Sequence, residues 1–510
     1  MSMLLHHFFD QTAARLPDKT ALICGEQRHS YAQLRDQVEQ LALALQRRGI
    51  QRGDRVALFL DNTVEMVVGI FAALKAGAVF MPINPLTKQD KLAYLLNDAR
   101  ASALLTQTSL APCYQAALAL NESVHTVLVV GLSEALDERT QPFTGLSADD
   151  DAPWQEPALI DQDLASIIYT SGSTGDPKGV MLSHLNMVSA TRSVSTYLGL
   201  VENDVILCAL PLAFDYGLYQ VLMAFAVGAT VVLERSFTFP VKMLEVMARE
   251  RVTVFPGVPT MFTMLMNLKS LDQHGLTGLR MITNTAAALP EERIRQLRNL
   301  FPQALLFSMY GLTECKRVTY LPPDQLDIRP TSVGRGMPNE EVWLVDEDGQ
   351  RLPHGCAGEL VIRGSNVMRG YWEKPLETAK RLKPGPLPGE MVLYSGDLFR
   401  TDAEGYLYFV SRKDDIIKSR GEKVSPREVE NALYAHEGVY EAAVVGVPDE
   451  LLGQAVKAFV VLKAGITLSE RDVIKHCLSR LESFMAPKHV EFVESLPTTD
   501  TGKIKKTGLN

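Results

Sequence analysis

A loop rich in glycine and hydroxyl side chains, residues 169–179, constrains the fold more than any other segment. It reads YTSGSTGDPKG and directly follows the apolar run 164–168. Glycines let the backbone wrap closely around a ligand, while hydroxyls, N–H groups and Lys178 donate to phosphate oxygens. A strand pattern before the loop and a helical pattern after it favour a phosphate-binding turn over a Ser/Gly-rich linker. The spacing matches neither GxxxxGK[ST] nor GxGxxG.

Size and composition indicate a multidomain protein of the cytoplasm. The chain has 510 residues, more than one compact core holds, so we expect two or three domains. Its net charge of -9 argues against general nucleic-acid binding. The six cysteines include no CxxC pair and predict neither a disulfide framework nor a zinc site. No apolar stretch approaches the ~18 residues of a membrane span, and the first ten residues lack the pattern of a secretory signal.

The periodicity of apolar residues predicts an α/β fold. Strand patterns at Thr20–Cys24 and 55–60 alternate with helical patterns at 30–49 and Val64–Lys75, and the alternation continues to about residue 283. Such alternation is typical of helices layered on mostly parallel sheets. Beyond about residue 332, short strands with turn signals predict a small β-rich subdomain.

A charged segment, 411–415, separates two apolar patterns and predicts a hinge. Beyond it the pattern reads helix, strand, strand and helix over 428–481. We therefore expect an N-terminal domain, 1–412, with two α/β subdomains and a β-rich one. A small, mobile α+β domain, 413–510, is expected to follow it.

Further motifs place charged side chains at turns. YGLTE, 310–314, ends in a carboxylate suited to Mg²⁺ on a nucleotide, and YSGD, 394–397, offers a carboxylate to ribose hydroxyls. Arg412 opens the charged segment, and PTTDTGK, 497–503, places a lysine on a loop. Each alone is more usually a solvated side chain, so only their combination is informative. His184, just after the phosphate loop, is expected to pack locally.

Together with LKAGAVFMP, 74–82, these motifs resemble the AMP-forming adenylating superfamily, which includes acyl-CoA synthetases, nonribosomal-peptide adenylation domains and luciferases. The resemblance covers essentially the whole chain, with the motifs in the family's order. It implies that ATP and Mg²⁺ activate a carboxylic acid to an acyl-adenylate with release of diphosphate, and that a thiol then takes the acyl group. Ser411 stands where the family has glycine and Lys506 where it often has arginine; neither change removes a catalytic group.

The resemblance also implies roles for individual residues. The ATP-binding residues would be Thr170, Ser171, Gly172, Ser173, Thr174, Gly175 and Lys178 at the phosphates, Thr285, Ala286 and Tyr310 at the adenine, and Asp397 and Arg412 at the ribose, with Gly311 as a further nucleotide-binding residue. Thr313 would touch the α-phosphate, Glu314 would bind Mg²⁺, and Lys503 would bridge the substrate carboxylate and the α-phosphate. Two anions must meet for this reaction, so a metal and a cation that neutralise them are required. A closing cap would exclude water, and Lys503 would leave for the thiol to enter.

Phe214-Asp215 bears on which acid is activated. It resembles the Phe-Asp pair of amino-acid adenylation domains, whose aspartate meets the α-ammonium, and a carboxylate in an apolar pocket needs a cation. Alternatively, Asp215 caps a helix that starts at Tyr216, and FDYG also resembles bacterial acyl-CoA ligases of uncertain substrate. The expected pocket residues are Phe214, Asp215, Tyr216, Tyr219, Met309, Cys315 and Val318. They favour a small or cyclic amino acid, proline-like or alanine-like.

The sequence leaves two questions open: which thiol accepts the acyl group, and what Lys316 and Arg317 do. We expect delivery either to a discrete carrier protein with a phosphopantetheine arm or to coenzyme A, the latter in a ligase for non-amino acids. Lys316 and Arg317 are either exposed charges or contacts for a carrier or an acidic substrate group. A luciferase-type oxygenase and a non-catalytic nucleotide sensor are the other readings. Loss of Lys178, Glu314 or Lys503 would favour the sensor, and all three are present.

Overall fold

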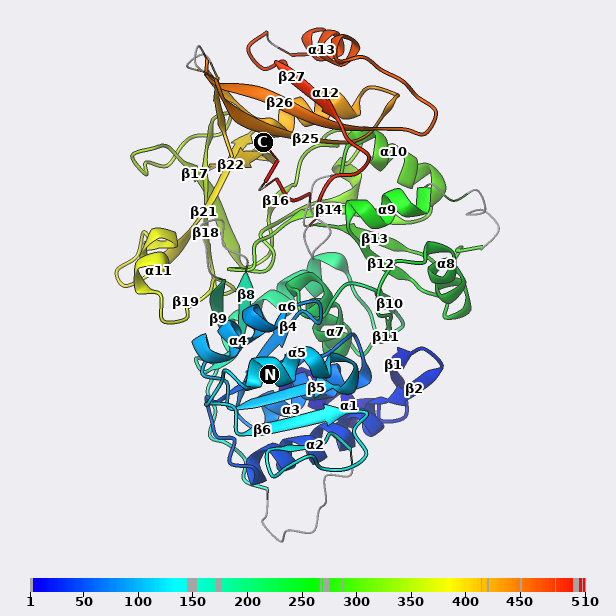
Figure 1. The fold of residues 1–510 in the computed structure, drawn as a ribbon, viewed down its shortest axis with the longest axis vertical. Coiled ribbons are helices and arrows are strands. Elements are labelled where there is room, and N and C mark those ends of the chain that lie inside the picture. Colours follow the sequence, from blue (N-terminus) through cyan, green and yellow to red (C-terminus); the bar gives the residue numbers. More distant parts are fainter. Residues whose placement is uncertain are drawn as a thin grey trace.

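Four β-sheets carry the fold in the computed structural model of the chain. The model describes residues 3–144, 154–170, 177–266, 268, 275–285, 289–413, 415–419, 422–449, 452–481, 483–498, 504–506 and 508–509. The blue N-terminal part lies at one end of the long axis, and the orange and red C-terminal unit lies at the other (Figure 1).

The phosphate loop belongs to an eight-stranded sheet with the order β19-β9-β8-β4-β3-β5-β6-β7. Its strands are β3 (Arg55–Phe59), β4 (Val79–Ile83), β5 (Ala103–Gln107), β6 (Thr126–Val130), β7 (Thr140–Pro142), β8 (Leu164–Thr170), β9 (Lys178–Ser183) and β19 (Gly370–Tyr371). The strands from β7 to β8 run parallel, and β9 and β19 extend the edge in antiparallel pairs. Because Thr170 pairs with Lys178, the loop joins two antiparallel strands, and the helix predicted after it starts only at His184.

A nine-stranded sheet carries the acid-binding side of the predicted site, in the order β16-β15-β14-β13-β12-β10-β11-β1-β2. Its strands are β1 (Thr20–Cys24), β2 (Gln27–Ser30), β10 (Val205–Cys208), β11 (Thr230–Leu233), β12 (Val254–Gly257), β13 (Met281–Asn284), β14 (Leu305–Tyr310), β15 (Thr319–Leu321) and β16 (Arg335–Gly336). The inner strands are parallel, so their carboxyl ends share one edge. Thr285 and Gly311, which follow β13 and β14, therefore lie at that edge.

Helices cover these two sheets and join them through an aromatic cluster. The helices of this part are α1 (His6–Arg15), α2 (Tyr31–Arg47), α3 (Val64–Lys75), α4 (Gln89–Asp98), α5 (Ala111–Leu118), α6 (His184–Leu198), α7 (Asp215–Val227), α8 (Pro240–Arg249), α9 (Pro259–Met266) and α10 (Glu291–Leu300). Phe9, Phe71 and Phe225, from α1, α3 and α7, meet with ring centroids 4.9 to 5.5 Å apart. Since α3 packs on β3 and β4 while α7 packs on β10 and β11, this cluster ties one sheet to the other. Full burial of each ring contributes about 1.5–3 kcal/mol.

The predicted β-rich subdomain is an antiparallel sheet with the order β17-β18-β21-β20, with β22 also paired to β21. It comprises β17 (Glu340–Val345), β18 (Ala357–Gly364), β20 (Leu382–Pro384), β21 (Met391–Thr401), β22 (Leu407–Arg412) and the helix α11 (Pro375–Arg381). Its long strand β21 carries Asp397 opposite Arg412.

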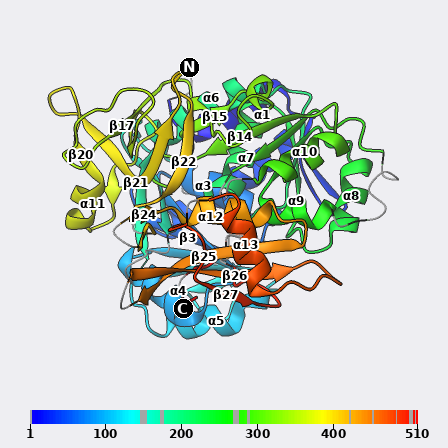
Figure 2. The same ribbon diagram turned by 90° about the horizontal axis from the view of Figure 1, so that it is seen from above.

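The C-terminal unit has its own sheet, in the order β24-β23-β26-β25 with β27 on β26. Its elements are β23 (Ile417–Ser419), β24 (Glu422–Val424), α12 (Pro426–Tyr434), β25 (Val439–Asp449), β26 (Gly453–Leu462), α13 (Glu470–Leu478) and β27 (His489–Phe492). The chain leaves the third sheet at Arg412 and enters this one at Ile417. Figure 2 shows the unit in front of the N-terminal layers when the molecule is seen from above.

The predicted fold class is confirmed: a large α/β part with several sheets precedes a small α+β part. The boundary at 412/413 and the mobility of the smaller part stay predictions. Within the described ranges, every helix is too short or too polar to serve as a membrane span.

His184 opens α6 and packs against α1. Its Nδ1 accepts a 3.0 Å hydrogen bond from the Leu5 N–H, and its ring lies edge-on to His6 with centroids 6.0 Å apart. Burial lowers the pKa of His184 to about 4 and takes the pKa of His6 well below its usual value. The prediction that His184 packs locally is confirmed.

Acid is expected to destabilise the chain through this histidine pair. Unfolded histidine takes up a proton near pH 6.5, whereas folded His184 does so only near pH 4. Stability is therefore lost as the pH falls through that window, by at most about 3 kcal/mol for His184. Urea unfolding at about pH 7 and about pH 4.5 measures the loss. His184→Asn should flatten the pH dependence, and His489→Asn, at an exposed position, should not. Equal slopes in both variants would contradict the assignment.

Candidate active site

The two ends of the phosphate loop are held by an antiparallel pair of strands. Thr170 ends β8 and Lys178 begins β9, and the Thr170 hydroxyl donates to the Lys178 carbonyl at 3.5 Å. The predicted loop residues Ser171, Gly172, Ser173, Thr174 and Gly175 lie outside the described residues. The Lys178 ammonium lies 2.5 Å from a carboxylate oxygen of Glu377 and 5.6 Å from the ring centroid of Tyr371. Its charge is therefore held by residues of α11 and β19.

A tight turn after β14 positions Glu314. A side chain on Gly311 would place its Cβ 2.2 Å from the Lys316 carbonyl oxygen, so this position requires glycine. The turn closes with a 2.6 Å bond from the Lys316 N–H to the Leu312 carbonyl. The Glu314 carboxylate accepts a 2.7 Å hydrogen bond from the Tyr371 hydroxyl. Thr313 is half-buried in the same turn.

Tyr371 lies between Lys178, predicted to bind phosphate, and Glu314, predicted to bind Mg²⁺. Burial and the Glu314 carboxylate raise the pKa of Tyr371 far above its usual range. The hydroxyl therefore stays protonated and donates a hydrogen bond to Glu314. Hydrogen bonds from Lys178 and Lys380 lower the pKa of Glu377 to about 2. Lys178, Glu377, Tyr371 and Glu314 therefore form a continuous set of charged and polar groups.

Glu314 fits the role of a Mg²⁺ ligand on a nucleotide. Among the described residues, nowhere do three or more His, Cys, Asp or Glu side chains gather to hold a metal by themselves. Mg²⁺ on nucleotides usually takes one or two carboxylates and completes its shell with phosphates and water. A single half-buried carboxylate beside the phosphate loop matches that donor set.

Asp397 and Arg412 face one another across β21 and β22, next to Tyr310. The Tyr310 hydroxyl donates to Asp397 at 2.6 Å, and Asp397 is 6% exposed. Burial raises the pKa of Asp397, and the Tyr310 hydroxyl and the Arg412 charge oppose that rise. The Tyr310 ring stands edge-on to Phe399, with centroids 4.8 Å apart. Thr285 is buried after β13, whereas Ala286 lies outside the described residues.

Asp215 is the first residue of α7. Phe214 precedes the helix, and no side chain caps it, so the alternative in which Asp215 caps a helix from Tyr216 is wrong. Tyr219 lies one turn later on the same face as Asp215. Tyr216 is anchored by a 2.7 Å bond from its hydroxyl to the Thr283 carbonyl of β13.

Lys316 and Arg317 are buried, so the reading of them as exposed charges is wrong. They are 1% and 5% exposed, and with Val194, Asp215 and Tyr219 they line a narrow gap, here named the Lys316 pocket, which is closed to a water molecule in this state. Burial lowers the pKa of Lys316 to about 8, and the Asp215 and Glu314 carboxylates oppose that fall. Arg317 lies over the Tyr216 ring, 4.6 Å from its centroid.

The other expected acid-pocket residues are buried or half-buried. Met309 is buried and its sulfur accepts a 2.9 Å bond from the Tyr197 hydroxyl. Cys315 is fully buried, and burial raises the pKa of its thiol. Val318 is buried at the end of the turn, and Phe214 is half-buried at the start of α7.

Lys503 lies outside the described residues, but the base of its loop is ordered by backbone bonds. Thr498 and Ile504 form an antiparallel bridge, and the Lys505 N–H donates to the Pro497 carbonyl at 2.7 Å. Lys506 lies 2.6 Å from the Glu430 carboxylate.

The sequence did not indicate a role for Tyr371 or Glu377, and it did not indicate that Lys316 is buried. Tyr371 and Glu377 are far from both loops in the chain, and no motif marks them. The strand pair β9–β19 brings them to Lys178. A lysine and an arginine side by side suggest a solvated surface, and only the turn after β14 reveals that they face inward.

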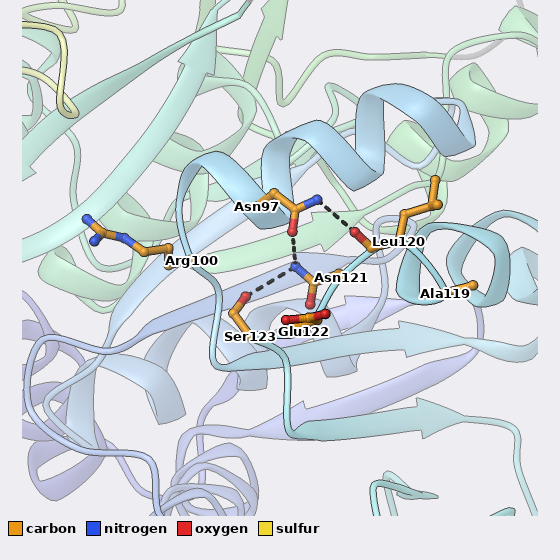
Figure 3. A pocket seen from close by; sticks show the side chains of 7 residues that line it. All are labelled: Asn97, Arg100, Ala119, Leu120, Asn121, Glu122 and Ser123. Atoms are coloured by element: carbon orange, nitrogen blue, oxygen red, sulfur yellow. Dashed lines mark hydrogen bonds between the residues drawn. The ribbon is translucent and has the colours of Figure 1, made fainter.

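A larger and more open pocket, of about 400 Å³, lies away from these residues between the end of α4 and the segment that joins α5 to β6 (Figure 3). Its side chains bond to one another: the Asn121 amide donates to Asn97 at 2.7 Å and to Ser123 at 3.1 Å. Asn97 in turn donates to the Leu120 carbonyl at 3.0 Å. These bonds hold the connection between α5 and β6, which is a structural role.

Comparison with known proteins identifies the family. Residues 9–372 match the AMP-binding enzyme family and residues 428–503 match the AMP-binding enzyme C-terminal domain, so the chain belongs to the AMP-binding enzyme superfamily. A long-chain-fatty-acid–CoA ligase of Bacillus subtilis is 32% identical over 99% of this chain and 94% of its own. Tyrocidine synthase 3 of Brevibacillus parabrevis is 31% identical over 99% of this chain, which spans 8% of that protein. The crystal structure of ATP-bound MatB from Rhodopseudomonas palustris has a TM-score of 0.89 at 30% identity and covers 99% of this chain and 98% of its own.

The predicted family resemblance is thus confirmed, and the chain is an AMP-forming ligase. It uses ATP to activate a carboxylic acid as an adenylate. Its relatives include CoA ligases and a peptide synthase, so the family alone leaves the acid and the thiol acceptor open.

Replacing Tyr310 by phenylalanine is expected to lower the free energy of unfolding by about 1–3 kcal/mol, because a buried Asp397 oxygen loses its donor. Urea unfolding of the variant measures the loss. Tyr406→Phe is the matched control, since that ring is buried and no bond to its hydroxyl occurs in the described part of the chain. Equal stability of Tyr310→Phe and wild type would show that the Asp397 contact is dispensable.

Proposed function

We propose that this adenylating enzyme activates a carboxylic acid without an α-amine and transfers the acyl group to coenzyme A. The observation that carries the proposal is the buried Lys316 ammonium in the same small pocket as Asp215. The expectation of an amino acid depended on Asp215 needing a cation from the substrate. Lys316 is a cation from the chain itself, and a substrate ammonium there would meet two like charges, Lys316 and Arg317.

The extent of the similarity supports the choice of acceptor. The chain matches nearly the whole of a long-chain-fatty-acid–CoA ligase, 94% of its length. Similarity over nearly the whole length of a CoA ligase supports coenzyme A as the thiol.

A second candidate is an amino-acid ligase that loads the phosphopantetheine of a separate carrier protein, with a small or cyclic, proline-like substrate. Asp215 favours it, because its carboxylate lines the Lys316 pocket without a hydrogen-bond partner in the described residues. The similarity to tyrocidine synthase 3 is compatible with it. In this case the substrate ammonium would have to compete with Lys316 for Asp215.

The residue roles belong to the proposal in either case. Thr170, Lys178 and the loop between them would hold the ATP phosphates, Tyr310 and Thr285 the adenine, and Asp397 with Arg412 the ribose. Lys178 and Glu314 would exchange their present partners, Glu377 and Tyr371, for the nucleotide. Mg²⁺ held by Glu314 would supply neutralising charge on the phosphates.

The reaction requires a cation besides Mg²⁺, because two negative charges must be neutralised. The acid and the α-phosphate are both anions, and Lys503 on its loop would hold the two in reach while Thr313 donates to the α-phosphate. The thiol needs the same space, so Lys503 would leave after adenylation. A rotation of the C-terminal part about the segment between Arg412 and Ile417 would remove it.

Assays of AMP and diphosphate release with a panel of acids test the proposal. We expect release with non-amino carboxylic acids and thioester formation with coenzyme A, at higher kcat/KM than with proline, alanine or other amino acids. Asp215→Asn should then change kcat/KM for the preferred acid by less than about tenfold. Release confined to amino acids, loading of a phosphopantetheine carrier only, and loss of activity in Asp215→Asn would establish the second candidate instead.

Lys503→Ala is expected to lower the rate of adenylation by about 10²–10³-fold, while thioester formation from a supplied acyl-adenylate survives. The two half-reactions are measured separately, with Lys505→Ala as the control because this exposed lysine lies on the same loop. Equal loss of both half-reactions in a folded Lys503→Ala enzyme would refute the role of Lys503.

A further inference from the structure

The Lys316 pocket contains more positive than negative charge. Lys316 and Arg317 are both buried, and no carboxylate oxygen of the described residues lies within 4.0 Å of either side chain. Asp215 lines the same pocket beyond that distance and compensates only in part. A buried cation without a paired anion is unfavourable, and a bound anion would offset that cost.

Unsatisfied donors converge on this pocket. The Lys316 ammonium, the Tyr219 hydroxyl and the Arg317 Nε are buried and have no hydrogen-bond partner in the described residues. Tyr219 is 3% exposed, and its ring centroid lies 5.5 Å from the Lys316 nitrogen. Buried donors are nearly always paired in native proteins, so these three donors need an acceptor that the described residues do not supply.

The backbone of Lys316 supports a functional role. Its φ is +72°, in the left-handed region that a lysine occupies at a cost of about 1–2 kcal/mol. Glycine would relieve that strain, but the chain places a long cationic side chain there. The turn that holds this conformation also aims Glu314, so the pocket lies next to the site of adenylation.

Glu340, on the other side of this turn, does not supply the missing charge. It is half-buried, burial raises its pKa well above the usual value, and Asn366 donates to it at 2.6 Å. Its carboxyl group bonds to Asn366, and no ion pair joins it to Lys316 or Arg317 in the part of the chain that the structure describes.

We propose that the acid activated by this enzyme carries a second carboxylate, which Lys316, Tyr219 and Arg317 bind while the first carboxylate meets ATP. This inference rests on the proposed function and names its substrate class. The Lys316 pocket would have to widen, and the second carboxylate would then accept bonds from the Lys316 ammonium and the Tyr219 hydroxyl. An ammonium at the same position would be repelled by both cations, and a methyl group would leave the donors unpaired.

Acids that differ only in the distal group test this proposal. Butanoate, succinate and 3-aminopropanoate end in a methyl, a carboxylate and an ammonium on the same spacer, and hexanoate, adipate and 5-aminopentanoate form a longer set. AMP and diphosphate release gives kcat/KM for each acid. We expect the dicarboxylate of at least one set to exceed its methyl counterpart by about 100-fold or more.

Variants of Lys316 assign the preference to this pocket. Lys316→Met keeps the length of the side chain and should reduce the ratio of dicarboxylate to methyl acid at least about tenfold, while Lys316→Arg retains most of it. Lys463→Met, an exposed lysine of the C-terminal part, is the control and should leave the ratio unchanged. Thermal unfolding of each variant separates loss of preference from loss of fold.

The outcomes separate the two proposals. AMP release with equal or greater kcat/KM for the methyl or ammonium acids refutes the second carboxylate and leaves the ligase intact. An unchanged ratio in a folded Lys316→Met enzyme likewise refutes the role of Lys316. Absence of AMP release with every acid refutes the proposed function and this inference together.

Discussion

Gly311 lets the chain fold back immediately after β14, because any side chain there would meet the Lys316 carbonyl oxygen at 2.2 Å. The hydrogen bonds that close this turn orient the Glu314 side chain toward Tyr371. They also place the Lys316 side chain in the same pocket as Asp215. One short segment thus carries the carboxylate proposed for the metal and the cation proposed for the acid. Both charges are oriented by backbone geometry, which costs no further ordering when ligands arrive.

Charged groups of the proposed nucleotide site pair with one another in this state of the molecule. Lys178 is held by Glu377, Glu314 by Tyr371, and Asp397 by Tyr310. Each pair stabilises a group that would otherwise be poorly solvated, and ATP would have to replace the first two. The Lys316 pocket differs, because its cations lack such a partner among the described residues.

Much of the fold could be predicted because it depends on local patterns. Alternating strand and helix periodicity located β1, α2 and α3 to within a few residues. The short strand patterns with turn signals after residue 332 located the antiparallel sheet. The strand β9 was missed, since its residues also suit the helix that follows. Asp215 was recognised as a pocket residue, but the need for a substrate ammonium was inferred without knowledge of Lys316.

The sequence by itself determined the family, the adenylation chemistry and the position of the phosphate loop, because glycines, hydroxyls and charged residues at set spacings are read along one chain. The tertiary structure alone decided which charges meet. Tyr371 and Glu377 reach Lys178 through the pairing of β19 with β9, and the turn after β14 buries Lys316 against α7. Such contacts join residues far apart in the chain, and burial, which sets their pKa values and their need for partners, exists only once the sheets and helices have packed.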